Sequence, residues 1–308
     1  MSRDEPHDVS EHLLGPHVVG RRVVVRRVVP GETGPSGGPL LTDVIGHCEA
    51  WVDNHVMVRR DDGTAVAIPL ADIVSGKPVP PRPSVRLRIT PLEAQLRSIA
   101  MWPDVVTEQL GDWVLRSASD PVRRANSALA MGQPGTSFSG AVERIVEFYS
   151  AKDTKPIVMV EADSDVCASF QGSGWVVDRP HEPDTLFLVS SVWQAIRALQ
   201  NVERDDLVLT EDGPRLEAHV GDVARARAAY DRDWLGLHAL NVEPSRRRQG
   251  LALALVDAML EWGAERGATT AYLQVLEDNV AARGLYERLG FTVHHAYRYL
   301  TPGPQARV

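Results

Sequence analysis

Hydrophobic and polar residues follow two different patterns along the chain, one before and one after a proline-rich segment at residues 77–83. Before it, short β-branched runs bounded by turn residues indicate strands, at residues 21–29, 41–46, 51–60 and 65–69. Asp62-Gly63 predicts a tight hairpin, because a type I′ turn needs positive φ at both central positions. Residues 77–83 cannot continue a sheet and read as a stiff linker. We therefore expect a disordered tail over residues 1–12 and a small five-stranded barrel over residues 13–83.

After the linker, strand and helix patterns alternate. Helices are predicted at residues 91–101, 138–151 and 165–170, and strands at residues 112–117, 124–129 and 156–160. The last third repeats this order with strands at residues 223–230, 234–242 and 269–276, a helix at residues 251–266, and a second helix that Asn279 caps and that ends near Leu289. The repetition predicts two related regions, residues 84–205 and 206–308. A single mixed domain with a coincidental order of elements is the alternative.

The composition excludes some classes of protein. The formal net charge of -8 argues against nucleic acid as the main partner, because binding phosphates needs a clustered basic surface. No apolar run reaches about 18 residues, so no transmembrane helix is expected. The N-terminus is polar and acidic, unlike a secretory signal, so we expect a cytoplasmic protein. Cys48 and Cys167 have no neighbour at metal-ligand spacing, which favours free thiols and no metal site.

The segment from Leu240 to Ala252 carries the most informative chemistry. A predicted strand ends at Val242, a loop with three arginines follows, and Gly250 opens a helix. Glycine lets the backbone approach a ligand closely. The first helical turn offers unpaired N–H groups and the positive end of the helix dipole. Together these features predict a site for a pyrophosphate, with Arg247 and Arg248 adding charge at its rim. The segment matches neither a P-loop nor a dinucleotide fingerprint.

The spacing Arg247-x-x-Gly250-x-Ala252 resembles the pyrophosphate motif of the GNAT superfamily of acetyl-CoA-dependent N-acyltransferases. Three further matches stand in the right order: Val242-x-Pro244, Asn279-x-x-Ala282-x-x-Leu285-Tyr286, and Leu289-Gly290-Phe291. The resemblance covers residues 215–300 and implies the mixed α/β GNAT fold, in a tandem arrangement preceded by a small all-β barrel. The whole order is similar to an actinobacterial-type subgroup with a Src-homology-3-like barrel and a degenerate N-terminal acyltransferase-like region. In that region Pro134 removes an N–H that a phosphate loop would use.

The resemblance implies a set of acetyl-CoA contacts. The backbone of Leu240, Asn241 and Val242 is expected to run beside the pantetheine arm. The loop and helix start are expected to hold the pyrophosphate, through Arg247, Arg248, Gln249, Gly250, Leu251 and Ala252. Asn279, Ala282 and Tyr286 on the following helix are expected to contact the remaining part of the CoA arm.

Tyr286 also stands where the family places a general acid that protonates the leaving thiolate. A tyrosine pKa near 10 keeps it protonated at neutral pH; the alternative is a packing tyrosine. The general base is expected on the strand before the loop, where relatives often carry glutamate, but this position is Gly236 here. His238, one pleat further, is the first candidate, against the alternative of a hydrogen-bonded core histidine. Glu243 and Glu277 are its rivals.

The sequence therefore predicts an acetyl-CoA:amine N-acetyltransferase that acts by direct attack in a ternary complex. A non-catalytic CoA-binding regulator on the same fold is the second reading. In a third reading the barrel is an interaction module that delivers the transferase to a protein or nucleic-acid partner, of which nucleic acid is the less expected. A protein partner or a homodimer would bind through the N-terminal region.

Overall fold

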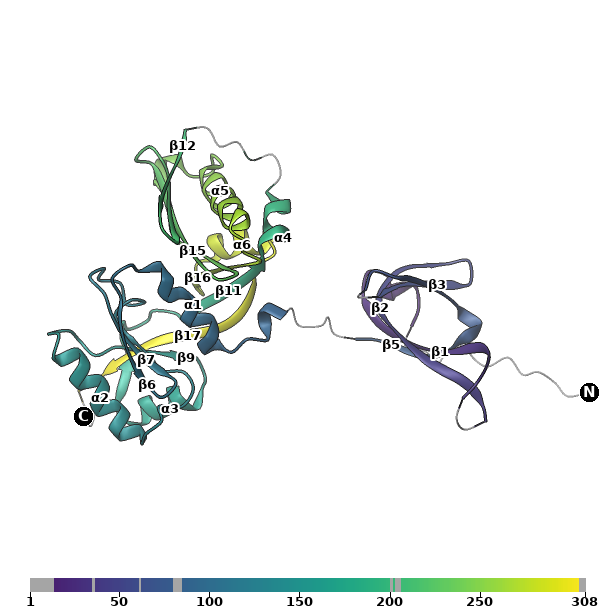
Figure 1. Ribbon diagram of the computed structural model, residues 1–308, viewed down its shortest axis with the longest axis horizontal. Helices are drawn as coiled ribbons and strands as arrows, with labels where there is room; N and C mark the ends of the chain where they lie inside the picture. Colours follow the sequence, from purple (N-terminus) through teal and green to yellow (C-terminus); the bar gives the residue numbers. More distant parts are fainter. Residues whose placement is uncertain are drawn as a thin grey trace, which may run out of the picture. The chain divides into compact units, whose positions relative to one another are not determined.

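The computed structural model describes residues 14–34, 37–60, 62–79, 85–199, 202 and 206–304. The chain divides into two compact units, Met1–Pro83 and Ser84–Val308. The tail predicted at residues 1–12 lies outside the described residues. Each unit has its own hydrophobic core, and Figure 1 labels helices and strands in both units.

The N-terminal unit is a five-stranded antiparallel sheet in the order β4-β3-β2-β1-β5. Its core is built from valines and one isoleucine, most of them on the strands, together with Leu14 and the buried Cys48. Its described elements are η2 (Pro16–Val18), β1 (Arg22–Thr33), β2 (Pro39–Val52), β3 (His55–Arg60), β4 (Ala65–Pro69), η3 (Leu70–Asp72) and β5 (Ile73–Pro78).

Two details of this unit differ from the prediction. A turn that the sequence reading missed lies at Asp53 and Asn54, both with positive φ (47° and 61°). Trp51 therefore belongs to the end of β2, which runs to Val52, and does not begin the next strand. The segment expected to be a linker begins later, because Pro78 is still paired with Val23 at the end of β5. A proline is tolerated there because β5 is an edge strand.

The C-terminal unit holds a 12-stranded mixed sheet covered by helices. Its described strands are β6 (Val106–Leu110), β7 (Trp113–Ser117), β8 (Ala128–Leu129), β9 (Val158–Glu161), β10 (Trp175–Val177), β11 (Thr185–Ser191), β12 (Leu207–Asp212), β13 (Arg215–Val220), β14 (Ala224–Asp231), β15 (Trp234–Val242), β16 (Thr270–Leu276) and β17 (Thr292–Pro302). Its described helices are η4 (Val85–Leu87), α1 (Pro91–Arg97), η5 (Ser98–Met101), α2 (Phe138–Ser150), α3 (Asp165–Gly172), α4 (Val192–Ala198), η6 (Pro244–Arg246), α5 (Leu251–Glu265) and α6 (Val280–Arg288).

The two halves of the sheet, on either side of the central strands β11 and β17, are built alike. In one half, α5 connects the parallel strands β15 and β16, and in the other half α2 connects the parallel strands β8 and β9. Each half donates its last strand to the other: β11 pairs with β16, and β17 pairs with β9 (Figure 1, β17 in yellow). β11 and β17 also pair with each other. The sheet is therefore continuous across the boundary expected near residues 205 and 206.

The two halves differ in how closely the prediction matches them. In the C-terminal half β14, β15, α5, β16 and α6 begin and end within two residues of the predicted limits. In the N-terminal half the strand predicted at residues 124–129 is reduced to Ala128–Leu129. The preceding residues instead form a loop, and Asn126 holds it together by donating to the carbonyl oxygens of Asp120 and Val122. This loop brings Arg124 to the other half of the molecule.

Candidate active site

β15 and β16 pair along only part of their length. The parallel pairing runs from Trp234 to Leu237 on β15 and ends there. Beyond that point β15 continues alongside β14, while β16 continues alongside β11. A bulge marks the separation: Ala226 of β14 stands opposite two residues, Ala239 and Leu240, and Ala239 has a φ of 54°. Such a bulge bends its strand and interrupts the ladder. β15 and β16 are no longer paired beyond Leu237, and we call the place where they diverge the opening.

The loop that leaves this opening ends at an uncapped helix. Gly250 is the N-cap of α5, has a φ of 83°, and brings no side chain to the first turn. Arg248 also has positive φ, 62°, and Arg247 is tied back to the strand by its Nε, 3.2 Å from the carbonyl oxygen of Val242. The N–H groups of the first turn have no intrahelical acceptor, and no acidic residue lies in that turn. The geometry is therefore that of an anion site.

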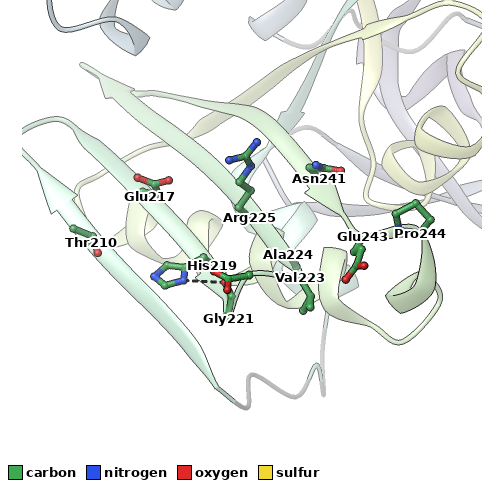
Figure 2. Close-up of a pocket in the computed structure, with 11 residues that line it drawn as sticks. Thr210, Glu217, His219, Gly221, Val223, Ala224, Arg225, Asn241, Glu243 and Pro244 are labelled. Atoms are coloured by element: carbon green, nitrogen blue, oxygen red, sulfur yellow. Dashed lines mark hydrogen bonds between the residues drawn. The ribbon is translucent and has the colours of Figure 1, made fainter.

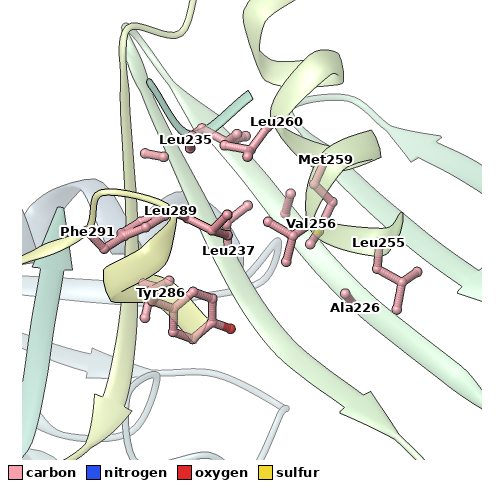
Figure 3. Packing of buried hydrophobic residues seen from close by; sticks show 14 of the residues in the cluster. Ala226, Leu235, Leu237, Leu255, Val256, Met259, Leu260, Tyr286, Leu289 and Phe291 are labelled. Carbon is pink, nitrogen blue, oxygen red and sulfur yellow. The ribbon is translucent and has the colours of Figure 1, made fainter. Parts of the chain in front are cut away.

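α6 brings a tyrosine to the same face of the sheet as α5. Asn279 caps this helix, as predicted, by accepting from the N–H of Ala282 at 3.1 Å. The Tyr286 ring packs against Phe291 and belongs to the core beneath α5. Figure 3 shows its hydroxyl directed away from Leu289 and Phe291. Tyr286 is only 7% exposed, and this burial raises the pKa of its hydroxyl to about 12, so the hydroxyl stays protonated at neutral pH.

His238 lies on the opposite face of β15, because Leu235 and Leu237 face α5 and the alternation turns His238 away. Its ring packs edge-on against Trp102, and its Nδ1 lies 3.4 Å from Nη1 of Arg124. Since arginine only donates hydrogen bonds, Nδ1 must accept, and the ring proton is on Nε2. Burial, then Arg124 and Arg227, lower the pKa of His238 to about 4. This environment opposes the uptake of a proton, which counts against His238 as the general base.

Three residues of this centre were not identified from the sequence: Arg124, Gln274 and Tyr297. The Tyr297 hydroxyl donates to Oε1 of Gln274 at 2.5 Å and accepts from Nε of Arg124 at 3.1 Å. They come from a loop, from β16 and from the exchanged strand β17, and no motif links them. Gln274 and His238 also line a cavity of about 10 Å³, which is about the room that one water molecule needs.

The absence of a side chain at residue 236 has a clear cause. A Cβ placed on Gly236 would overlap the phenol end of Tyr272. That phenol is fixed, because its hydroxyl donates to the carbonyl oxygen of Arg97 at 3.2 Å. There is therefore no room in this chain for a glutamate at the position where the sequence reading noted that relatives often have one.

The two rival glutamates are not close to His238. Glu243 follows the end of β15, five residues beyond His238, which is about 16 Å along an extended strand at about 3.3 Å per residue. Glu277 is exposed beyond the end of β16, and its carbonyl oxygen accepts from Arg283. Neither is brought together with His238 and Tyr286 at the point where the strands separate.

Glu243 instead lines a groove of about 670 Å³ on the sheet face opposite α5. The groove is formed by β12, β13, β14 and the end of β15 (Figure 2). Figure 2 shows Arg225 between Glu217 and Asn241, and His219 hydrogen-bonded to the carbonyl oxygen of Gly221. Arg225 and Asn241 are cross-strand partners. Only the bulge separates this pair from the next one, Arg227 and His238. The groove therefore begins beside the opening.

Comparison with known proteins decides the family. A family model described as "Probable histone acetyltransferase Rv0428c C-terminal" matches residues 92–300. A second model, "Rv0428c N-terminal Sm-like domain", matches residues 17–77. The chain belongs to the Rv0428c-type acetyltransferase family. It is 30% identical over 278 residues to "Probable histone acetyltransferase Rv0428c" of Mycobacterium tuberculosis, a match that covers 85% of this chain and 89% of that protein.

More distant relatives of this acetyltransferase match over shorter stretches or at lower identity. The "[Ribosomal protein bS18]-alanine N-acetyltransferase" of Escherichia coli K12 is 39% identical over 70 residues, 22% of this chain and 47% of that protein. A solved "GCN5-related N-acetyltransferase from Kribbella flavida" superposes with a TM-score of 0.48 at 18% identity, over 72% of this chain and 96% of that chain. The predicted GNAT N-acetyltransferase is confirmed. The small barrel is assigned to the Sm-like type, where the sequence reading had named the Src-homology-3-like type.

The N-terminal half of the acetyltransferase has a closed counterpart of this site. Its loop before α2 is occupied by the chain itself: Asp112 accepts from the N–H of Gln133 at 2.8 Å, and Ser137 caps the helix by accepting from Gly140. The pairing of β8 with β9 is short and ends with the hydrogen bond from the N–H of Ala130 to the carbonyl oxygen of Met159. The carboxylate of Asp112 and the hydroxyl of Ser137 thus accept hydrogen bonds from backbone N–H groups that could otherwise bind an anion.

Two general features of the described residues bear on function. Within the described ranges, no group of three or more His, Cys, Asp or Glu side chains is arranged to hold a metal ion. None of the helices in that part of the chain combines the length and the apolar character that crossing a bilayer requires.

Proposed function

We propose that the chain transfers the acetyl group of acetyl-CoA to a primary amine by direct attack in a ternary complex. One observation carries the proposal: β15 separates from β16 after Leu237, and its unpaired end leads through a short loop to the uncapped start of α5. A thioester can lie in that opening while the phosphates of the same molecule meet the helix N-terminus. Membership of an acetyltransferase family supports the same reading.

The residues expected to hold CoA follow the path from the opening to α6. The backbone of Leu240, Asn241 and Val242 lines the opening, and the bulge at Ala239 leaves a backbone donor for the thioester carbonyl. Arg247, Arg248 and Gln249 of the loop, with Gly250, Leu251 and Ala252 of α5, are proposed to bind the pyrophosphate. Asn279, Ala282 and Tyr286 of α6 complete the site on the α5 side.

Tyr286 and the acceptor are proposed to meet the thioester from opposite faces of the sheet. The Tyr286 pKa is raised to about 12, whereas a thiol has a pKa near 8.5. Full proton transfer to a thiolate would thus cost about 5 kcal/mol at 1.36 kcal/mol per unit. We therefore assign Tyr286 chiefly as a hydrogen-bond donor to the sulfur as negative charge develops there. The proton that the sulfur finally takes comes from the amine through solvent.

On the acceptor side we assign roles that differ from the general bases expected from the sequence. His238 is assigned a positioning role, with Nε2–H as a donor toward the opening, because Arg124 occupies its Nδ1. Neither His238, with its low pKa, nor Glu243, in the groove, suits the role of a direct base. We propose that the amine proton leaves through water, for which the cavity beside His238 and Gln274 has room.

The test separates an enzyme from a CoA-binding regulator. Tyr286→Phe keeps the ring in the core and removes the hydroxyl, so we expect CoA affinity to change less than threefold while kcat falls about 10–100-fold. The measurements are calorimetric CoA titration and thiol release with a panel of amines. If no amine in the panel accelerates CoA release by the wild-type protein, although CoA binds, the regulator reading replaces this one.

A further inference from the structure

The acceptor side of the opening carries guanidinium groups where a carboxylate base would be expected. Arg124 contacts His238 directly, and Arg227 is the cross-strand partner of His238. The Arg227 side chain is 52% exposed, and its nearest carboxylate, Asp120, is 3.9 Å away. A lysine-like ammonium ion placed here would meet two positive groups. An amine that is already neutral would not be repelled.

No carboxylate among the described residues lines the small cavity beside His238; Asp120 pairs with Arg227 at 3.9 Å, and Asp231 is paired with Arg97 at 3.1 Å. Trp102 follows η5, Ser98 lies in it, and Tyr272 and Gln274 belong to β16; all four are uncharged and line the small cavity. Tyr297 reaches the cluster from β17 and is hydrogen-bonded to Gln274. The electrostatic influences that shift the His238 pKa come from Arg124 and Arg227 alone, and both lower it. The two guanidinium groups beside His238 therefore disfavour a further positive charge next to its ring.

The charge changes sign further along the same face. The 670 Å³ groove begins at Arg225 and Asn241, about 7 Å beyond Arg227 and His238 for two residues of a strand. Three carboxylates line it against one guanidinium: Glu217, Asp222 and Glu243 against Arg225. Its volume is within the range of ligand sites. A positive opening followed by an acidic groove suits a ligand that is uncharged at the reacting amine and basic beyond it.

We propose that the acceptor is the α-amine at the N-terminus of a polypeptide whose following basic residues lie in this groove, and that lysine ε-amines are poor acceptors. The proposal rests on the acetyltransfer proposed above and specifies its acceptor. An α-amine has a pKa near 8.0 and a lysine amine near 10.4. At neutral pH the neutral fraction of the α-amine is therefore about 250-fold larger. A site without a carboxylate base can bind the neutral α-amine directly, with no proton to remove before the attack.

The experiment compares two forms of one basic peptide with the full-length protein and acetyl-CoA. The peptide has alanine first, arginines next and a single lysine at its end. One form has a free N-terminus and a dimethylated lysine, and the other has an acetylated N-terminus and a free lysine. We expect kcat/KM to be at least tenfold higher for the free N-terminus at pH 7.5. Its pH profile should rise with a slope of one up to the α-amine's own pKa.

Variants test the assigned residues. Arg227→Gln should reduce the preference for the α-amine at least threefold, whereas Arg179→Gln, another exposed arginine (66%) with a weak ion pair, should leave it unchanged. Glu217→Gln should raise KM for the basic peptide and not for one with alanines in place of the arginines. A preference for the free lysine, or an unchanged preference in Arg227→Gln, overturns the inference while acetyl transfer stands. If neither form accelerates CoA release, the inference fails together with the acetyltransfer proposal.

Discussion

A pair of adjacent histidines on β17 should make the C-terminal unit sensitive to acid. His295 is 6% exposed and stacks on Phe187, and its Nε2 lies 3.0 Å from the Gln95 amide nitrogen. Its Nδ1 lies 2.8 Å from Nδ1 of His294, whose Nε2 is 3.1 Å from the carbonyl oxygen of Ile89. All these contacts are satisfied when both rings are neutral. An added proton would set two N–H groups against each other.

The sign and size of the effect follow from the pKa of His295. Burial, and then His294, lower it to about 3 from an ordinary value of 6.5. The unfolded chain therefore binds more protons than the folded one below pH 6.5, so stability is complete above that pH and is lost as pH falls toward 3. For one such group, lowering the pH from 7 to 5 should cost about 2 kcal/mol. Burial also lowers the His294 pKa, which acts in the same direction.

Urea unfolding at pH 7.0 and pH 5.0, followed by tryptophan fluorescence, measures this cost. Six of the seven tryptophans lie in the C-terminal unit, all except Trp51, so the signal reports mainly that unit. His295→Gln should lose about 2 kcal/mol less between the two pH values than the wild type. The control His181→Asn removes an exposed histidine at a positive φ that asparagine tolerates. An equal loss in His295→Gln and the wild type would refute the reasoning.

Three further substitutions have expected outcomes in the same unit. Gly236→Ala should destabilise it by about 1–3 kcal/mol in urea unfolding, because the new methyl group overlaps the phenol of Tyr272; no loss would show that this ring moves aside. Asn279→Ala should cost about 1 kcal/mol through the lost cap of α6, and an unchanged unfolding midpoint would contradict that. Tyr297→Phe should cost about 1–3 kcal/mol because Gln274 loses its donor, and a stability equal to wild type would mean that water replaces the hydroxyl.

The segment from β14 to α6 could be predicted because its signals are local. The 3.6-residue spacing of apolar residues in α5, the glycine at its start and the asparagine that caps α6 all act within one turn of the chain. The turn at Asp53 and Asn54 has a local signal too, since both residues tolerate positive φ. The strand predicted at residues 51–60 runs through this turn, although Asp53, Asn54 and His55 interrupt its apolar residues.

The remaining part of the site depends on contacts that are distant in sequence. Arg124 and His238 are 114 positions apart, and Tyr297 reaches Gln274 only because β17 crosses into the other half of the sheet. Nothing in the neighbourhood of Arg124 announces a site, and its predicted strand is a loop in the structure. The strand exchange therefore explains why motifs point to the residues proposed to bind CoA but not to Arg124 and Tyr297.

Calorimetric titration of CoA into matched glycine variants tests the anion site at the start of α5 most directly. Gly250→Val adds a branched side chain at a φ of 83° in the open space before the helix. Gly213→Val makes the same change at a φ of 57° in the turn between β12 and β13, also with open space around it. We predict that Gly250→Val weakens CoA binding at least tenfold and that Gly213→Val leaves it within twofold of wild type. Equal CoA affinity in all three proteins would contradict the account.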